Sequence, residues 1–294
     1  MNIFFPFLPP AELRKPPTEE ERALWKEQAR LEWIRKAGPA VPWTPDIKWK
    51  PVMQIQTASY GWFVRDLFPE ASEVLPGEAF SRAKCFVLSP SGRYCYAKKI
   101  LPAFGLLDTM SGNRKGKVFF DEPVMIPMLF ERKLIQGPAT YGSFPEMPWM
   151  SLTPMELMSL RPGVKMAKGH TIIAGLGLGH QLIEVSHKPT VTAITLVEYS
   201  GELVSWLLPR IQAHMDPRVP LRVLIGDAYK IVPQLTADVA LIDIFPRYGG
   251  NRERWLDRTT EILKGGGWVY RRGRDVRART QSCPGIKKVW IWGA

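Results

Sequence analysis

The sequence predicts an α/β fold, in which residues 150–294 form a doubly wound, mostly parallel sheet and residues 1–149 form a Pro-rich, partly β region. Five short apolar runs follow one another after His170: TIIAG, AITLVE, LRVLIG, DVALID and GWVYR. Helix-like segments separate successive runs, and this alternation is typical of parallel sheets. The first 150 residues hold 18 of the 27 prolines and show no such alternation. The chain therefore changes character near residue 150.

The N-terminal region is predicted to begin with a helix at residues 18–37, because Thr18 and Glu21 have the spacing of a capping box. Residues 39–51 are expected to form an extended connector. Within residues 83–131 the runs KCFVLS, RYCYAKKI and GKVFFDE alternate with Gly, Pro and Asn turn signals. This pattern predicts a small antiparallel sheet, in which we expect no catalytic chemistry.

The segments between the later apolar runs predict helices at residues 180–187, 200–215, 228–234 and 251–263. Pro209 is expected to kink or shorten the second of them, because proline removes a backbone donor. The last run, KKVWIW, could complete the sheet.

Composition indicates a folded protein, with 45% hydrophobic and 23% charged residues among 294. Forty Lys and Arg against 28 Asp and Glu give a net charge of +12, which favours anionic partners. Cys85, Cys95 and Cys283 match neither a disulfide framework nor a zinc site, and the four histidines lack metal-ligand spacing, so we expect no metal and a reduced, cytoplasmic setting. No apolar run is long enough to cross a membrane or serve as a secretory signal.

The most informative motif is a glycine-rich turn, GLGLG, between a predicted strand and a predicted helix. Glycines let the backbone approach a ligand closely and direct helix N-terminal amides at its negative groups. The predicted cofactor contacts in this turn are Gly175, Leu176, Gly177 and Gly179. Glu198 ends the next apolar run, 19 residues after Gly179, where a carboxylate can accept both ribose hydroxyls. The turn and this glutamate together predict an adenosine-containing cofactor.

Two further carboxylates follow apolar runs: Asp227 follows the third run and Asp243 closes the fourth. Ligands of open α/β sheets bind at the carboxyl ends of the strands, so these side chains should meet in one crevice. Tyr199 and Ala228, beside the predicted ribose and adenine contacts, complete the predicted cofactor site. His180 stands where a dinucleotide-binding turn prefers Gly or Ala, which disfavours a nicotinamide cofactor.

In the order of these motifs, residues 150–272 resemble the class I S-adenosylmethionine-dependent methyltransferases, which have a Rossmann-like sheet. The resemblance implies that the glycine turn holds the methionine part of the cofactor and that Glu198 binds the ribose. It also implies that Asp227 reads the adenine amino group and that Asp243 lies beside the sulfonium and the substrate. The LKGGG segment at 263–267 is similar to the turn before that family's fifth strand. The implied function is methyl transfer to an unidentified acceptor.

Within that superfamily, the HKPTV segment, the TLVE segment and GDA at 226–228 are most similar to the spermidine-synthase-like polyamine aminopropyltransferases. Those enzymes carry a second aspartate three residues after the position of Asp243, and this chain has Pro246 there. The net charge and the missing second carboxylate disfavour a polycationic substrate. Aminopropyl transfer therefore stands as an alternative, as does a non-catalytic protein that binds a cofactor or nucleic acid.

Residues 243–251 (DIFPRYGGN) are predicted to form the lip of the active site. Asp243 would act there as a base or amine anchor and Tyr248 as a stacking or hydroxyl partner, unless Tyr248 only packs the turn. Glu156 is a weaker candidate, for which a capping or surface role is the alternative. His180 either touches the cofactor carboxylate or is an exposed residue of the first helical turn.

The C-terminal segment, residues 262–294, carries much of the net positive charge. It holds eight Lys or Arg against Asp275 alone, so +7 of the +12 lies there. Its interleaved aromatic residues are Trp268, Tyr270, Trp290 and Trp292. Such a cluster could bind a nucleic-acid backbone and stack on bases, and a solvated basic tail is the alternative.

Overall fold

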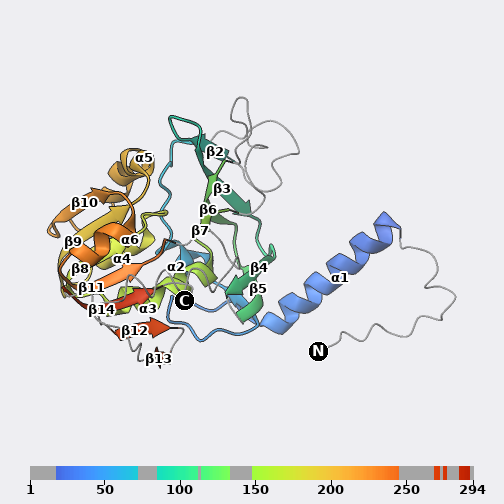
Figure 1. The fold of residues 1–294 in the computed structure, drawn as a ribbon. Helices are drawn as coiled ribbons and strands as arrows, with labels where there is room; N and C mark the ends of the chain where they lie inside the picture. Colours follow the sequence, from blue (N-terminus) through green and yellow to red (C-terminus); the bar gives the residue numbers. More distant parts are fainter. Residues whose placement is uncertain are drawn as a thin grey trace.

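The structure is a computed structural model that describes residues 18–71, 85–111, 114–132, 148–244, 268–271, 274–276 and 285–291. These residues form a mixed α/β fold with one seven-stranded sheet and two smaller sheets. Figure 1 shows the seven-stranded sheet and its helices on one side of the molecule, with the smaller sheets beside them. Tyr248, the segment 251–263 and the LKGGG turn all lie outside the described residues.

The larger sheet contains all five apolar runs that predict strands. In chain order its strands are β8 (Gly169–Ala174), β9 (Val191–Glu198), β10 (Leu221–Ile225), β11 (Ala237–Ile242), β12 (Trp268–Arg271), β13 (Arg274–Val276) and β14 (Ile286–Ile291). Their order across the sheet is β10-β9-β8-β11-β14-β12-β13, and every neighbouring pair is parallel except β12 and β13. The predicted parallel α/β sheet is confirmed.

The final strand, β14, lies inside this sheet and separates β11 from β12. It comes from the run KKVWIW, whose position the sequence left open. Trp290 is buried, and a Cβ added to Gly163 would come within 2.7 Å of its ring. A glycine at this position therefore makes room for the indole. In this place Trp290 is not available to stack on a nucleic-acid base.

Helices cover both faces of this sheet. They are α3 (Pro154–Met166), α4 (His180–Ser186), α5 (Gly201–Gln212) and α6 (Ala228–Ile231), with the 3-10 turn η4 (Val232–Gln234). Alternate strand residues point to opposite faces. Ile173 and Leu241 pack in the cluster that contains α3, α4 and α5, whereas Ile172 and Ile242 pack with α6 and η4.

These helices match the predicted segments 180–187, 200–215 and 228–234. Helix α5 continues past Pro209 and ends at Gln212, three residues before the predicted end. Within the described segments, no helix combines the length and the apolar character needed to cross a membrane.

The N-terminal part contains the two smaller sheets. The first, in the order β2-β3-β6-β7, is antiparallel and consists of β2 (Cys85–Leu88), β3 (Tyr94–Leu101), β6 (Val124–Glu131) and β7 (Met150–Ser151). The second joins β1 (Val52–Ile55) in parallel to β5 (Arg114–Phe120), which pairs antiparallel with β4 (Leu107–Ser111). The antiparallel sheet predicted from 83–131 is confirmed for the runs that became β2 and β3, whereas the run GKVFFDE became β5 of the second sheet, where it pairs in parallel with β1. Residue 150, where the sequence predicts a boundary, begins β7, which pairs with β6 of the N-terminal sheet and directly precedes α3.

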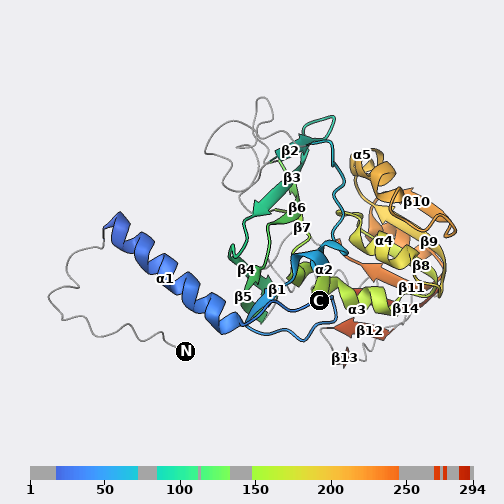
Figure 2. The same cartoon turned by 180° about the vertical axis from the view of Figure 1, so that it is seen from behind.

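The first helix, α1 (Glu19–Ala37), has the predicted capping box between Thr18 and Glu21. None of its side chains is buried, and both views show it extending away from the sheets (Figures 1 and 2). Its C-terminal half is attached to the β4–β5 region by Arg30, which donates to the Phe104 carbonyl, and by Lys117, whose ammonium lies 5.6 Å from the Trp33 ring centroid. A short helix, α2 (Thr57–Gly61), follows β1.

Candidate active site

A cavity of about 250 Å³ lies at the carboxyl ends of β8, β9, β10 and β11. This is slightly below the ~300–1,000 Å³ of typical small-molecule sites. Seven of the predicted cofactor residues line it: Gly175, Gly177, Glu198, Tyr199, Asp227, Ala228 and Asp243. The topology thus brings together side chains that are up to 68 positions apart in the sequence.

The glycine turn needs glycine at the two positions that line the cavity. Gly175 has φ +98°, and a Cβ there would lie 2.0 Å from the backbone oxygen of Asp243. Gly177 has φ +50°, and its Cβ would lie 2.3 Å from the sulfur of Met150. Side chains rarely adopt such backbone angles, and a Cβ would meet backbone at Gly175 and the flexible end of Met150 at Gly177. Both glycines therefore allow neighbouring segments to close on the turn.

Two other predicted contacts in the turn have different surroundings. Gly179, with φ +76°, precedes α4, and a Cβ there would overlap Ile211 of α5. The side chain of Leu176 is buried, and its amide donates to Glu198. Neither residue lines the cavity, so Gly179 serves the packing of α4 on α5 and Leu176 serves the position of Glu198.

Glu198 ends β9 and is held by two backbone amides. Its Oε2 accepts from Leu176 N at 2.7 Å and its Oε1 from Ser200 N at 2.8 Å. Burial raises the pKa of Glu198, and these amide hydrogen bonds oppose the increase. Each carboxylate oxygen retains a second lone pair. Glu198 can therefore accept ligand hydroxyls while the amides fix its position.

We expect Glu198→Gln to destabilise the fold although it preserves size. A carboxylate offers two acceptor oxygens to the two amides, whereas an amide side chain offers one, so one buried N–H loses its partner. The expected cost is about 1–3 kcal/mol in urea unfolding at pH 8. Glu27→Gln, at an exposed position of α1, should leave the unfolding midpoint nearly unchanged. Equal midpoints for the two variants would contradict this role of Glu198.

At the ends of β9 and β10 the cavity is lined by Tyr199, Asp227 and Ala228. Asp227 caps α6, because its Oδ1 accepts from Tyr229 N at 2.9 Å, and Ala228 beside it is buried. Tyr199 is exposed at the mouth of the cavity. A flat ligand group could therefore lie between the tyrosine and the start of α6.

Two acidic side chains, Glu156 and Asp243, line the cavity near the end of β11. Asp243 opens onto the cavity but is otherwise surrounded by protein, and burial raises its pKa to about 7. Glu156, from the first turn of α3, is 5% exposed. Burial raises its pKa well above the usual value, and the neighbouring Asp243 charge raises it further. The cavity thus holds an acidic pair whose charges interact.

The capping or surface role considered for Glu156 is wrong. Thr153 caps α3 through its Oγ1, which accepts from Glu156 N at 3.4 Å, and the Glu156 carboxyl reaches the cavity wall instead. The expectation that Asp243 has no acidic partner, drawn from Pro246, is therefore corrected. The partner comes from α3, 87 residues earlier.

His180 lies away from this cavity. It is 7% exposed, so the expectation of an exposed first-turn residue is wrong. Together with Phe63 and Leu152 it lines a separate small pocket between α4 and the segment after α2. Burial there lowers its pKa to about 4.

The N-terminal sheet, in which no catalytic chemistry was expected, contributes cavity residues that the sequence did not identify. Arg93 and Tyr94, at the start of β3, and Glu131, at the end of β6, all line the cavity, as do Trp149 and Met150. Tyr94 and Glu131 are register partners in the β3–β6 pair. They belong to no recognisable motif, because their proximity depends on strand pairing across 37 residues.

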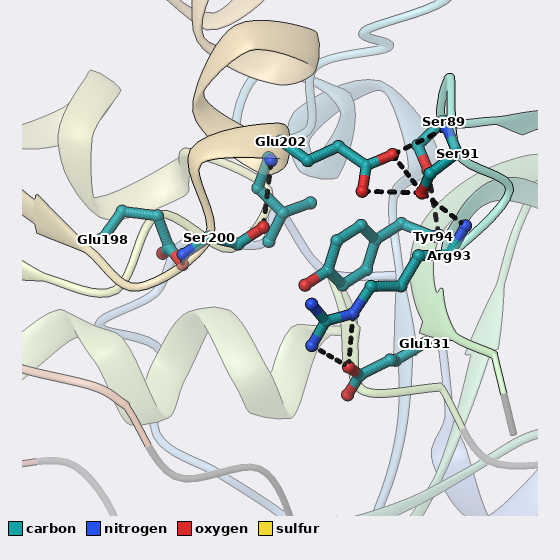
Figure 3. A network of polar contacts seen from close by, with 9 residues as sticks. Ser89, Ser91, Arg93, Tyr94, Glu131, Glu198, Ser200 and Glu202 are labelled. Carbon is teal, nitrogen blue, oxygen red and sulfur yellow. Dashed lines mark hydrogen bonds and ion pairs between the residues drawn. The ribbon is translucent and has the colours of Figure 1, made fainter. Parts of the chain in front are cut away.

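Polar contacts attach this sheet to the cofactor side of the cavity (Figure 3). Ser91, in the β2–β3 turn, donates through its backbone N and its Oγ to Glu202 at the start of α5. The Tyr94 ring stacks on Trp149 at 5.9 Å between centroids, and Tyr94 and Ser200 both line the cavity. The cavity is therefore built jointly by the two parts of the chain.

Acidic side chains predominate among the described residues that line the cavity, whereas the chain as a whole is basic. The lining carboxyl groups are Glu131, Glu156, Glu198, Asp227 and Asp243, and the lining cation is Arg93. Such a site favours a ligand that carries positive charge. Among the described residues, no cluster of three or more His, Cys, Asp or Glu has the arrangement of a metal site.

Neither a protein-family model nor a curated protein matches the sequence. Solved structures that align with parts of the chain include precorrin 8w decarboxylase from Methanobacterium thermoautotrophicum, at 17% identity and a TM-score of 0.26. They also include a Pyrococcus horikoshii protein assigned as an RNA methyltransferase (16%, 0.29) and Trm5b from Pyrococcus abyssi (14%, 0.28). The alignments cover 36%, 45% and 53% of this chain and 52%, 62% and 44% of those chains. This chain thus spans less than two thirds of each of them, and these weak likenesses assign no chemistry to it.

Proposed function

We propose that this chain binds S-adenosylmethionine in the cavity and transfers its methyl group to an acceptor. One observation supports this above all others: the glycine turn, Glu198, Asp227 and Asp243, each at the end of a different strand, surround a single cavity. The order of these groups along the chain is also the order that the resemblance to the class I methyltransferases implies.

The side chains present fit such a cofactor. Glu198 offers lone pairs for the two ribose hydroxyls, and Asp227 with Ala228 would hold the adenine near the start of α6. Glu156 and Asp243 suit a positively charged sulfur, because a nearby cation stabilises the ionised form of a buried carboxyl group. The acidic lining therefore agrees with a sulfonium ligand better than with a dinucleotide, whose phosphates would be repelled.

When bound, the cofactor supplies a methyl group that a lone pair of the acceptor can take from the positively charged sulfur. The chain's own contribution would be mainly alignment and exclusion of water. Asp243 can take up the proton that an amine or hydroxyl acceptor releases, since a base with a pKa of about 7 suits neutral conditions. We propose Tyr248 as a further acceptor contact.

Aminopropyl transfer is the second candidate, and the Glu156–Asp243 pair is what favours it. Two adjacent carboxyl groups at the reacting end of the cavity could hold a protonated amine of a polyamine acceptor. The donor for that reaction would be decarboxylated S-adenosylmethionine. Formation of an aminopropylated product from this donor and a polyamine would favour this candidate over methyl transfer.

A nucleic-acid acceptor, bound by the basic C-terminal segment, and a cytoplasmic location both remain predictions. The structure describes the side chains of Lys287 and Lys288 in that segment. Lys287 forms an ion pair with Asp238 at 2.6 Å. Binding that weakens steeply with salt and with neutralisation of Arg271, Arg272 and Arg274 would support this partner.

Calorimetric titration with S-adenosylmethionine and S-adenosylhomocysteine tests the cofactor site. We expect micromolar binding by the wild type and at least about tenfold weaker binding by Glu198→Ala and Asp227→Ala, because each loses hydrogen bonds to a charged acceptor. Asp216→Ala, outside the cavity, is the control and should bind normally. Absence of binding by the folded wild type would contradict the proposal. Circular dichroism would verify that each variant is folded.

A further inference from the structure

Arg93 is the cationic exception in an acidic cavity. Among the described residues that line the cavity, it is the single positive side chain against five carboxyl groups. A ligand carboxylate that entered such a cavity would be repelled by those carboxyl groups that are ionised, unless a cation lay close to it. The position of Arg93 therefore determines whether a ligand with a carboxylate can bind.

The guanidinium of Arg93 is oriented but remains accessible. Its Nε and Nη2 donate to one oxygen of Glu131, at 3.0 and 2.7 Å, and Nη1 takes no part in this ion pair. The side chains are 52% and 39% exposed. Exposed ion pairs add little stability, so a ligand anion can replace Glu131 as the partner of Arg93 at a small cost in free energy. A guanidinium also matches a carboxylate in a bidentate geometry that an ammonium cannot reproduce.

The backbone of Arg93 is fixed from two sides. Its N–H donates to the Oγ of Ser91, which is itself bound to Glu202, and its carbonyl accepts from Arg132 N at 2.8 Å. Figure 3 shows Arg93 and Tyr94 extending together from the β2–β3 turn, with the guanidinium beside Glu131. The backbone of Arg93 is thus held in place by the fold independently of any ligand.

A series of contacts connects Arg93 to the glycine-turn side of the cavity. The Tyr94 ring, 5.0 Å from the Arg93 guanidinium carbon, stacks on Trp149. Trp149 precedes Met150, whose sulfur lies 3.1 Å from Leu178 N in the turn. This side would hold the amino-acid part of the cofactor, and Asp227 marks the adenine side.

We propose that Arg93 binds the α-carboxylate of the cofactor and thereby selects S-adenosylmethionine over its decarboxylated form. The inference rests on the proposed cofactor site. It also separates the two candidate functions, because the aminopropyl donor lacks this carboxylate. Arg93 is then a specificity-determining residue, supplied by the N-terminal sheet to a site formed mainly by the larger one.

The test compares three ligands by calorimetry: S-adenosylhomocysteine, its decarboxylated form, and 5′-methylthioadenosine. The wild type should bind S-adenosylhomocysteine at least about tenfold more tightly than the decarboxylated ligand. Arg93→Ala should abolish this preference. It should leave the affinities for the decarboxylated ligand and for 5′-methylthioadenosine within about twofold of their wild-type values. Arg93→Lys, which keeps the charge but loses the planar fork, should retain part of the preference. Arg218→Ala, in an exposed ion pair with Asp216, should retain all of it.

The possible failures differ from one another. Equal binding of the carboxylated and decarboxylated ligands by the wild type would overturn the inference, and so would an equal loss for all three ligands in Arg93→Ala. In both cases the proposed cofactor site would stand. Failure of the folded wild type to bind any of the three ligands would overturn the proposed function as well. If Arg93→Ala did not fold, an unchanged preference in Arg93→Lys and Arg93→Gln would overturn the inference.

Discussion

Gly175→Ala is expected to lower the free energy of unfolding by at least about 3 kcal/mol. The new methyl group would lie 2.0 Å from the Asp243 backbone oxygen, at φ +98°. The clash is with backbone rather than with a flexible side chain. It can be relieved only by separating β8 from the end of β11, although Asp243 N and Ala174 O are hydrogen bonded there at 2.9 Å. Urea unfolding measures the loss.

Gly201→Ala is the matched control for this experiment. Its added methyl group would meet only Ile225, at 3.5 Å, which is an ordinary contact, and it would lie at the start of α5. Its stability should stay within about 1 kcal/mol of the wild type, because alanine is favoured over glycine in helices. A Gly175→Ala variant as stable as Gly201→Ala would show that the turn can open without cost. That result would contradict the close approach of the turn to the Asp243 backbone.

The sequence predicts the parallel sheet well because its strands carry local signals. Each of the runs that became β8 to β11 is apolar and alternates with helix-like segments. The crevice follows from the same information, since the carboxyl ends of adjacent parallel strands meet at one edge. Glu198, Asp227 and Asp243 could therefore be placed together before their distances were known.

The remaining features depend on pairings that no local pattern encodes. β14 enters the sheet between β11 and β12, and its fit involves the contact between Trp290 and Gly163 of α3. Arg93 and Glu131 meet through the β3–β6 register, and Glu156 meets Asp243 through the packing of α3. Single charged residues in short strands resemble ordinary surface residues in a sequence. Their role becomes visible only when the strands are paired.

The acidic pair makes the stability of the fold depend on pH in a defined direction. The pKa of Asp243 is raised from 3.8 to about 7 in the folded chain, so the unfolded chain releases this proton at lower pH. Stability is therefore lost as the pH rises from about 4 to 7, by at most about 4 kcal/mol at 1.4 kcal/mol per pH unit. Solvation of Asp243 by cavity water reduces that figure. Asp243→Asn should thus be more stable than the wild type at pH 8 and nearly equal to it at pH 4.

The same titration should govern cofactor affinity in the opposite direction. Ionised Asp243 attracts a sulfonium, so the affinity for S-adenosylmethionine relative to S-adenosylhomocysteine, whose sulfur is uncharged, should rise about tenfold or more between pH 5.5 and 8.5. The ratio cancels the titration of groups that the two ligands share. Asp243→Asn should make the ratio independent of pH, whereas Asp238→Asn, outside the cavity, should preserve its rise. If Asp243→Asn gained stability at pH 8 but its affinity ratio still rose with pH, the sulfur would lie elsewhere in the cavity. The acidic pair would then face the acceptor, as aminopropyl transfer requires.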